Sequence, residues 1–142
     1  MVRPATLDDL PAIVNLASES PTSAQWSREQ YQSILSPSRF ALVVEENQIL
    51  GFLVAHVIGP EWELENIVIA NSARRRGLGL QLLQSLIRTA GSRAASFIFL
   101  EVRESNLPAR RLYEKHGFQA SGMRPSYYRN PSEAAIIYRL GL

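Results

Sequence analysis

Residues 65–86 constrain the fold of this chain more than any other stretch, because they combine a strand, a turn and a helix. The β-branched run Ile67–Ile69 has the length and composition of a strand. From Leu78 onward, apolar residues recur at helical spacing as far as Ala90, and Gly91 is the expected helix stop. This order of elements predicts an α/β domain.

The turn between that strand and helix, residues 74–79, reads Arg-Arg-Arg-Gly-Leu-Gly. The first N–H groups of a helix lack internal partners, and the helix dipole and three arginines add positive potential there. Glycines at positions 77 and 79 allow a ligand to approach the backbone closely. The turn therefore suits a phosphate or diphosphate. A solvated basic turn, with glycines placed only for packing, is the alternative.

Other phosphate-binding loops do not fit this turn. A Walker loop would end in Gly-Lys-Ser/Thr, and no such triplet occurs in the sequence. A dinucleotide fingerprint needs three spaced glycines, whereas only Gly77 and Gly79 are present here.

The composition excludes several classes of protein. With no cysteine, the chain can form no disulfide, cysteine nucleophile or thiolate metal site. His56 and His116 are too far apart in the sequence for a recognisable zinc motif, so no metal is expected. There is no apolar run of about 18 residues and no apolar leader, so we expect a cytoplasmic protein without a membrane span. A net charge of +2 does not argue for nucleic acid as a partner.

The whole chain, residues 1–142, is expected to form a single domain with a mixed sheet of about seven strands and about four helices on both faces. The strand at 62–69 should run parallel to the strand at 97–102, because a helix connects them. The expected strands are 1–4, 40–45, 49–58, 62–69, 97–102, 118–123 and 134–140. The expected helices are 6–17, 27–35, 78–90 and 106–115.

Glu101 is the only charged residue in the apolar segment 97–102. Because both faces of this segment are apolar, we expect a central strand. A carboxylate there is costly unless it is paired, hydrogen-bonded or open to a cleft. A partly desolvated carboxylate in a cleft is also a better general base. The alternative is a glutamate at a strand end that pairs with Arg103 or with an arginine from another element.

The turn fits an Arg-x-x-Gly-x-Gly pattern, and this pattern with the order of elements resembles the GNAT superfamily of acetyl-CoA-dependent N-acetyltransferases over nearly the whole chain. Segments 63–69, 100–106 and 112–118 are similar to the RimI-type, ribosomal-protein-alanine N-acetyltransferases. The resemblance implies acetyl transfer from acetyl-CoA, as co-substrate, to the N-terminal alanine of a protein, with a small-subunit ribosomal protein as the implied acceptor. Another protein terminus, a lysine or a small-molecule amine is the alternative acceptor.

The same resemblance implies roles for individual residues. Glu101 would be the general base, Tyr113 would protonate the departing sulfur, and Asn106 would contact CoA. By composition alone, Tyr113 is better explained as an aromatic residue that packs beside Phe118. The implied coenzyme contacts are the backbone of Ile67, Val68 and Ile69 for pantetheine, and Arg74, Arg75, Arg76, Gly77, Leu78 and Gly79 for the diphosphate.

Four aromatic residues could form the wall of a peptide groove, although packing in the core is an equal alternative. They are Trp26, Tyr31, Tyr127 and Tyr128, of which the last two are expected in a loop between the final strands. We expect a monomer or weak dimer. A non-enzymatic CoA sensor or nucleic-acid binder is a weaker hypothesis, because no basic stripe with interleaved aromatic residues occurs.

Overall fold

A computed structural model of the chain describes residues 1–21, 23–24 and 26–142. Its strands are β1 (Val2–Pro4), β2 (Arg39–Glu45), β3 (Ile49–Ile58), β4 (Glu61–Ile69), β5 (Phe97–Arg103), β6 (Gln119–Tyr128) and β7 (Glu133–Gly141). Its helices are α1 (Leu10–Ser18), α2 (Arg28–Gln32), α3 (Leu78–Ser92) and α4 (Leu107–Lys115). Short 3-10 helices are η1 (Leu7–Asp9), η2 (Ser33–Leu35) and η3 (Asn71–Ala73).

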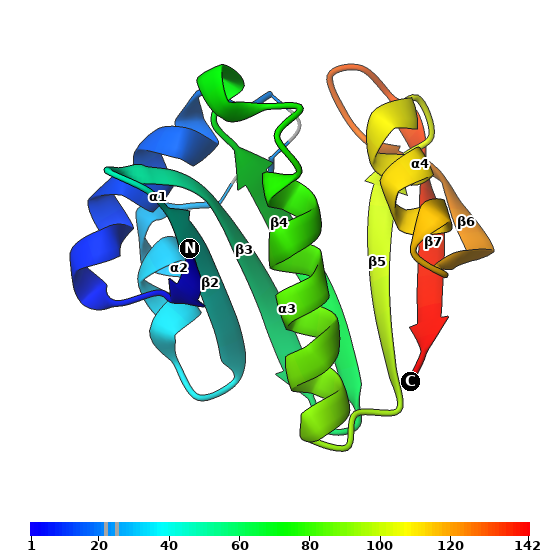
Figure 1. Ribbon diagram of the computed structural model, residues 1–142. Coiled ribbons are helices and arrows are strands. Elements are labelled where there is room, and N and C mark those ends of the chain that lie inside the picture. The colour runs from blue at the N-terminus through cyan, green and yellow to red at the C-terminus, as the bar shows by residue number, and fades with distance from the viewer. Residues whose placement is uncertain (22, 25) are drawn as a thin grey trace.

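The strands form one mixed sheet in the order β1-β2-β3-β4-β5-β7-β6 (Figure 1). The predicted seven-stranded mixed sheet is therefore confirmed, as is the parallel pairing of β4 with β5 through the α3 crossover. Helices α3 and α4 lie on one face of the sheet, and α1 and α2 lie on the other. No helix in the described part of the chain is long and apolar enough to span a bilayer.

Several predicted boundaries were wrong. The helix expected at 6–17 is divided into η1 and α1, and the one expected at 27–35 is divided into α2 and η2. Gly91 lies inside α3, which ends one residue later, because Ala94 rather than the glycine adopts the left-handed conformation after the helix, with φ of 59°. Tyr127 and Tyr128 belong to β6 and not to a loop.

Strands β4 and β5 pair over only four residues each, and then they diverge (Figure 1). The last pair is Leu64 opposite Leu100. Just beyond it, the register between β3 and β4 shifts, so that Glu65 forms a bulge between Leu64 and Asn66. A bulge bends its strand and increases the local twist. The two neighbouring central strands are thereby separated at one end, which leaves space for a ligand between them.

Two apolar clusters hold the layers together. On one face, α3 buries Leu78, Leu82, Leu83, Leu86 and Ala90 against the sheet, which is the helical spacing predicted from the sequence. On the other face, residues of α1, α2 and η2 pack on β2, β3 and the end of β4. Burial of such side chains, at roughly 25 cal/mol per Å² of apolar area, is the main stabilising contribution.

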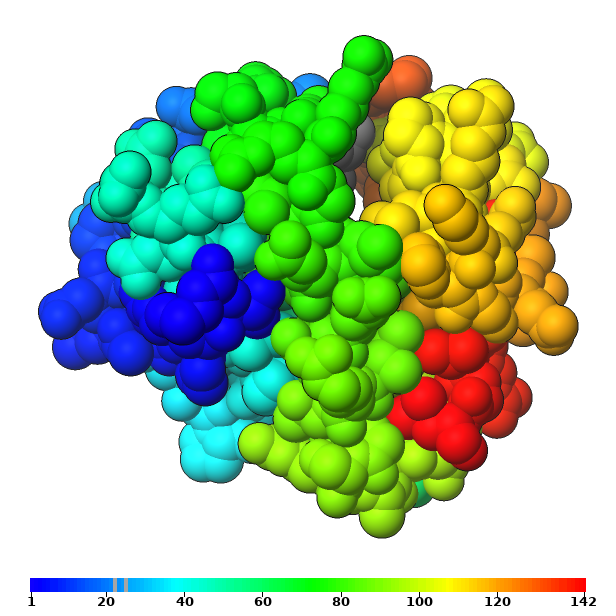
Figure 2. Space-filling model, viewed as in Figure 1, coloured from blue at the N-terminus to red at the C-terminus, as the bar shows by residue number. Residues whose placement is uncertain are grey.

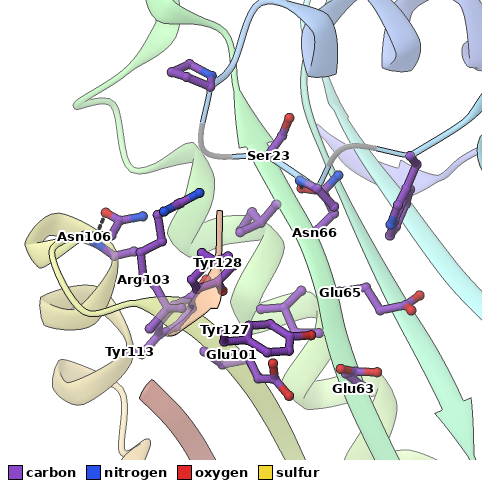
Figure 3. A pocket seen from close by; sticks show the side chains of 18 of the residues that line it. Ser23, Glu63, Glu65, Asn66, Glu101, Arg103, Asn106, Tyr113, Tyr127 and Tyr128 are labelled. Atoms are coloured by element: carbon purple, nitrogen blue, oxygen red, sulfur yellow. Dashed lines mark hydrogen bonds between the residues drawn. The ribbon is translucent and has the colours of Figure 1, made fainter. Parts of the chain in front are cut away.

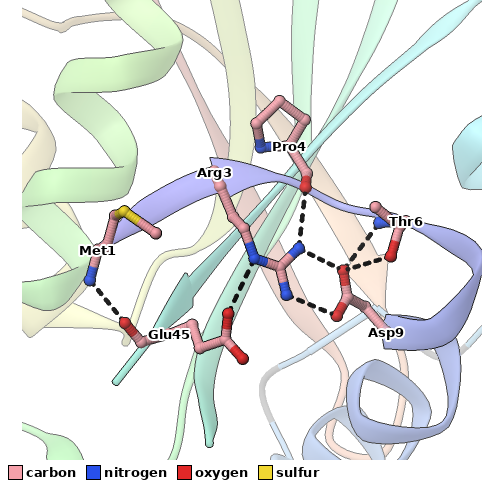
Figure 4. Close-up of polar contacts among 6 residues, drawn as sticks. All are labelled: Met1, Arg3, Pro4, Thr6, Asp9 and Glu45. Atoms are coloured by element: carbon pink, nitrogen blue, oxygen red, sulfur yellow. Dashed lines mark hydrogen bonds and ion pairs between the residues drawn. The ribbon is translucent and has the colours of Figure 1, made fainter. Parts of the chain in front are cut away.

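Arg3 joins β1 to η1 and β2 (Figure 4). Its guanidinium donates two hydrogen bonds to the carboxylate of Asp9, at 2.8 and 2.9 Å, and one to Glu45 at 2.9 Å. The Asp9 carboxylate also accepts the backbone N–H of Thr6. These contacts, with the Arg3 hydrogen bond first, lower the pKa of buried Asp9 from 3.8 to about 2.

The Arg3–Asp9 contact should make the stability of the protein depend on pH. Because the pKa of Asp9 is lower in the native state than in the unfolded state, its ionised carboxylate stabilises the fold fully at pH values above the unfolded-state pKa. This contribution is lost as the pH falls from about 4 to about 2. Urea unfolding of the parent protein and of Asp9→Asn should therefore show a stability difference that shrinks over this range. Asp8→Asn, at an exposed neighbour, is the control. A difference that stays constant with pH would contradict this assignment.

Candidate active site

A cavity of about 700 Å³ opens where β4 and β5 diverge (Figure 3). On the surface, Figure 2 shows a hollow between the green residues of α3 and the yellow residues of α4. The described residues that line the cavity are Pro21, Ser23, Ala24, Trp26, Glu63, Leu64, Glu65, Asn66, Ile67, Leu100, Glu101, Val102, Arg103, Asn106, Ala109, Tyr113, Tyr127, Tyr128 and Arg129.

The Glu65 bulge decides which side chains of β4 face which side of the sheet. Before the bulge, Leu64 packs with the α3 cluster, so Glu63 points to the opposite face. After the bulge, Ile67 packs with the α3 cluster and Asn66 takes the opposite face. The extra residue shifts the alternation by one, and Glu63 and Asn66 therefore line the same side of the cavity.

Glu101 lies on that same side. Its neighbours in β5, Leu100 and Val102, are buried in the α3 cluster, so the Glu101 side chain points to the α1 and α2 face. Only 13% of this side chain is exposed, and its Oε1 lies 3.2 Å from Nε of Arg124. The sequence left the partner open between Arg103 and an arginine from another element, and the structure selects the latter.

Tyr113 approaches the cavity from the opposite face. It extends from α4 and is buried, with its ring 5.6 Å from Phe118 and 6.3 Å from Tyr138, measured between centroids. Burial, and to a smaller extent the neighbouring Tyr128, raises the pKa of the Tyr113 hydroxyl. Tyr113 is thus a protonated donor over the whole neutral range. It shares one cavity with Glu101, although the two residues belong to opposite faces of the sheet.

Two further tyrosines, from the end of β6, lie beside Glu101 (Figure 3). Their rings make an edge-on contact with centroids 5.2 Å apart. Burial and then the Glu101 charge raise the pKa of Tyr128 to about 12. The Glu101 charge, followed by burial, raises the pKa of Tyr127. Both hydroxyls therefore remain protonated near neutral pH, and they can donate hydrogen bonds into the cavity.

Arg103 fixes the segment that follows these tyrosines. Its guanidinium donates to the carbonyl oxygens of Arg129 and Pro131 and to Oε1 of Glu133, each at 3.2 Å. It also lies 4.4 Å from the centroid of the Tyr128 ring. One planar side chain at the end of β5 thereby holds the wall of the cavity that β6 and its loop provide.

The basic turn lies at the start of α3. Gly77 caps this helix in the left-handed conformation, with φ of 75°, and the first intrahelical bond runs from the Gln81 N–H to the Gly77 carbonyl. The N–H groups of residues 78–80 precede that bond and lack intrahelical partners. A Cβ at Gly79 would meet only Ile69 Cγ1, at 3.8 Å, so packing does not require glycine there. These features fit a bound diphosphate.

The arginines of the turn differ in their surroundings. Arg76 donates to both carboxylate oxygens of Glu46, at 2.6 and 2.7 Å, and roughly half of each side chain is exposed. Its charge is therefore partly offset within the protein. Arg75 adopts a positive φ of 64°, an uncommon conformation for an arginine.

Comparison with known proteins identifies this arrangement. The sequence model of the Acetyltransferase (GNAT) family matches residues 7–118. The chain belongs to the GNAT acetyltransferase family. The resemblance inferred from residues 63–69, 74–79, 100–106 and 112–118 is thereby confirmed at the level of the family.

Among GNAT proteins, the chain is similar to ribosomal protein bS18-alanine N-acetyltransferases. That of Escherichia coli K12 is 32% identical over 135 residues, 93% of this chain and 90% of the relative. That of Haemophilus influenzae is 41% identical over 98 residues, 67% of this chain and 66% of the relative. The crystal structure of the ribosomal-protein-S18-alanine N-acetyltransferase from Escherichia coli matches with a TM-score of 0.90 and 29% identity, covering 99% of this chain and 92% of that one.

A more distant match shows the GNAT fold alone. The Arabidopsis thaliana NAA60 structure, solved in complex with acetyl-CoA, has a TM-score of 0.91 at 13% identity and covers 100% of this chain and 98% of that one. The predicted fold class is therefore confirmed.

The cavity of this GNAT domain contains some of the predicted site residues and not others. Glu101, Tyr113, Asn106, Ile67, Trp26, Tyr127 and Tyr128 line it. Tyr31 does not, because it is buried in the α1 and α2 cluster, where its ring packs 5.2 Å from Trp26 between centroids. Val68 is buried in that same cluster, and Ile69 packs against the α3 cluster. Asn106 caps α4 by accepting the N–H of Ala109.

Sequence reasoning missed Glu63 and Glu65. Glu65 lies 2.7 Å from Nε of Arg39. Atoms that could act as metal ligands lie within 4.8 Å of one another on His56, Glu63 and Glu65. The nearby Arg39 guanidinium already supplies positive charge to this group. The alternation Glu61-Trp62-Glu63-Leu64-Glu65 indicated that these carboxylates share a face, but it gave no indication of the bulge that aims them into the cavity.

Glu63 should destabilise the protein near neutral pH. Burial, followed by the charges of Glu65 and Glu101, raises the pKa of Glu63. Its contribution to stability is therefore present at pH values below the ordinary carboxyl pKa, and it is lost as the pH rises through the native-state pKa. Glu63→Gln keeps the neutral form, so we expect it to be more stable than the parent at pH 7 and equally stable near pH 4. Urea unfolding at both pH values measures this, with Glu61→Gln, at an exposed position of the same strand, as the control. A Glu63→Gln protein less stable than the parent at pH 7 would refute it.

Proposed function

We propose that this protein transfers the acetyl group of acetyl-CoA to the α-amine of an N-terminal alanine, with a ribosomal protein as the acceptor. The observation that carries the proposal is the gap between β4 and β5, where a carboxylate from one face and a buried tyrosine from the other meet in one cavity. The names of the relatives support the acceptor. A cytoplasmic location agrees with an acceptor that is a component of the ribosome.

Acetyl-CoA would bind on the α3 and α4 side. Its diphosphate would rest on residues 74–79, and the pantetheine arm would follow the unpaired edge of β4 beyond Leu64, as the free backbone groups there allow. Apolar residues of the cavity, among them Ile67 and Ala109, would lie along the arm. The acceptor peptide would enter from the face that carries Glu63, Glu101 and Tyr127.

Glu101 would accept a proton from the acceptor, directly or through a water molecule. An α-ammonium group has a reference pKa of about 7.7–8.0, so only a modest driving force is needed. The free amine then forms the new N–C bond as the C–S bond of the thioester breaks. Tyr113 would donate its proton to the departing sulfur and would regain one, through solvent, from the nitrogen as the amide forms. The positioning of both substrates would supply much of the rate.

The test is a panel of short peptides that differ in the first residue, assayed for acetyl transfer from acetyl-CoA. We expect transfer to the α-amine of peptides that begin with alanine, located by mass spectrometry after fragmentation. Transfer only to lysine side chains or to free polyamines would replace the proposed acceptor with another amine. The absence of transfer to any amine, with intact binding of acetyl-CoA, would contradict the proposed activity.

A further inference from the structure

Arg124 is the cation beside the proposed base. It lies on β6, the edge strand of the sheet, and it is not among the residues that line the cavity. The two side chains differ in exposure, at 56% for Arg124 and 13% for Glu101. A nearly buried carboxylate is thus neutralised by a side chain that remains largely in solvent.

Arg124 is held more weakly than the other arginine at the cavity. Arg103 makes three hydrogen bonds and stacks on an aromatic ring, whereas the contacts found for Arg124 in the described part of the chain are the 3.2 Å ion pair and a guanidinium 5.5 Å from the centroid of Tyr127. The regular pairing of β6 with β7 is also interrupted after Arg124 and resumes at Tyr128. Because the Arg124 side chain is largely in solvent and makes a single ion pair, it can leave at small cost once another cation takes its place at Glu101.

Glu101 cannot easily remain without a counter-ion. It shares the cavity with the carboxylates of Glu63 and Glu65. Arg39 is the cation that pairs with Glu65, and its side chain is largely buried in that ion pair. An ionised carboxylate that is mostly shielded from water and has like charges nearby needs a positive partner. A protonated acceptor amine is such a partner, and it would reach Glu101 from the cavity.

We propose that Arg124 is a displaceable counter-ion of Glu101. It neutralises the carboxylate in the free protein and leaves when the α-ammonium of the acceptor binds. It returns when acetylation has converted that ammonium into a neutral amide and Glu101 has released the accepted proton to solvent. The guanidinium competes with both the substrate and the product, but only the protonated substrate carries a positive charge that can replace it at Glu101. Arg124 is in this account a positioning residue that favours release of the acetylated product, and the inference rests on the proposed role of Glu101.

A titration that needs no turnover tests the exchange of cations. The side-chain carboxyl ¹³C resonance of Glu101, assigned by its loss in Glu101→Gln, is followed as butylammonium chloride is added at constant ionic strength. We expect half-saturation at an amine concentration about two- to five-fold lower in Arg124→Gln than in the parent, which corresponds to the loss of one exposed ion pair. Equal midpoints, or a resonance that does not respond in either protein, would overturn the proposal.

Steady-state kinetics with a peptide that the protein acetylates gives the second readout. Arg124→Gln should lower the KM for the peptide and the inhibition constant of the acetylated product by a similar factor, with the KM for acetyl-CoA unchanged. Arg124→Lys should restore the parent values, and Arg111→Gln, at an exposed position of α4, is the control for loss of one charge. A raised peptide KM in Arg124→Gln would show that Arg124 binds the acceptor instead. If no peptide is acetylated while the carbon resonance behaves as expected, the proposed function fails and the exchange of cations stands.

Discussion

Glu101→Gln is expected to lower the turnover of acetyl transfer by about 10²- to 10⁴-fold, the range typical of a lost general base. Glutamine has nearly the same shape as glutamate but cannot accept the proton of the acceptor ammonium. Binding of acetyl-CoA should be unchanged, because the Glu101 side chain lies on the face opposite to α3 and α4. Turnover and the dissociation constant, measured by a coupled thiol assay and by calorimetry, separate the two effects.

The pH dependence of the Glu101→Gln protein sharpens this test. Without the base, only acceptor molecules already deprotonated in solution can react, so the residual rate should rise about tenfold per pH unit up to about pH 8 and then level off. Glu104→Gln, which removes an exposed carboxylate three residues further along the chain, should behave like the parent. Parent-like turnover in Glu101→Gln at pH 7 would remove Glu101 from the mechanism.

Tyr113→Phe is expected to lower turnover by about 10²-fold, near the lower limit for a general acid. The effect should be smaller than that of Glu101→Gln, because a thiolate with a pKa of about 8.5 is already a good leaving group. Since burial raises the pKa of Tyr113, this hydroxyl should not titrate below about pH 10, and the loss should be uniform across the neutral range.

The Tyr113→Phe protein should fold as the parent does. The phenylalanine ring can keep the packing of Tyr113 against Phe118 and Tyr138. The midpoint of urea unfolding and the affinity for acetyl-CoA should therefore stay within a few-fold of the parent values. Full turnover in this variant would assign Tyr113 to core packing alone, the reading that composition favours.

The fold was largely predictable from local signals. The leucine spacing from Leu78 and the strand–helix–strand order were sufficient for α3 and for the parallel pair β4 and β5. Ser27 and Gln30 form the capping box that their spacing indicates at the start of α2. The error at Gly91 arose because glycine is tolerated inside a helix as well as at its end.

The candidate site was predictable only in part. Glu101 and Asn106 stand out because a charged residue in an apolar strand and a helix cap have local signatures. The partners of Glu101 do not, since Arg124 comes from β6 and reaches it through pairing with β7, which no local pattern specifies. The exclusion of Tyr31 from the cavity also depends on long-range packing, because an aromatic residue at its position suits either a groove wall or the core.

The basic turn is central to the proposed function, because its free N–H groups would hold a diphosphate and so aim the thioester at the acceptor amine beside Glu101. The most direct measurement is a calorimetric titration of acetyl-CoA into the parent, Gly79→Ala and Gly79→Asp. A Cβ fits at this position, and an acidic residue in the first turn stabilises a helix, so both variants should fold at least as well as the parent. We predict that Gly79→Ala binds acetyl-CoA more weakly than the parent, because its Cβ limits the approach of the diphosphate to the backbone, and that charge repulsion weakens binding to Gly79→Asp further, by at least about tenfold. Equal affinity of all three proteins, or no binding by the parent, would contradict the account.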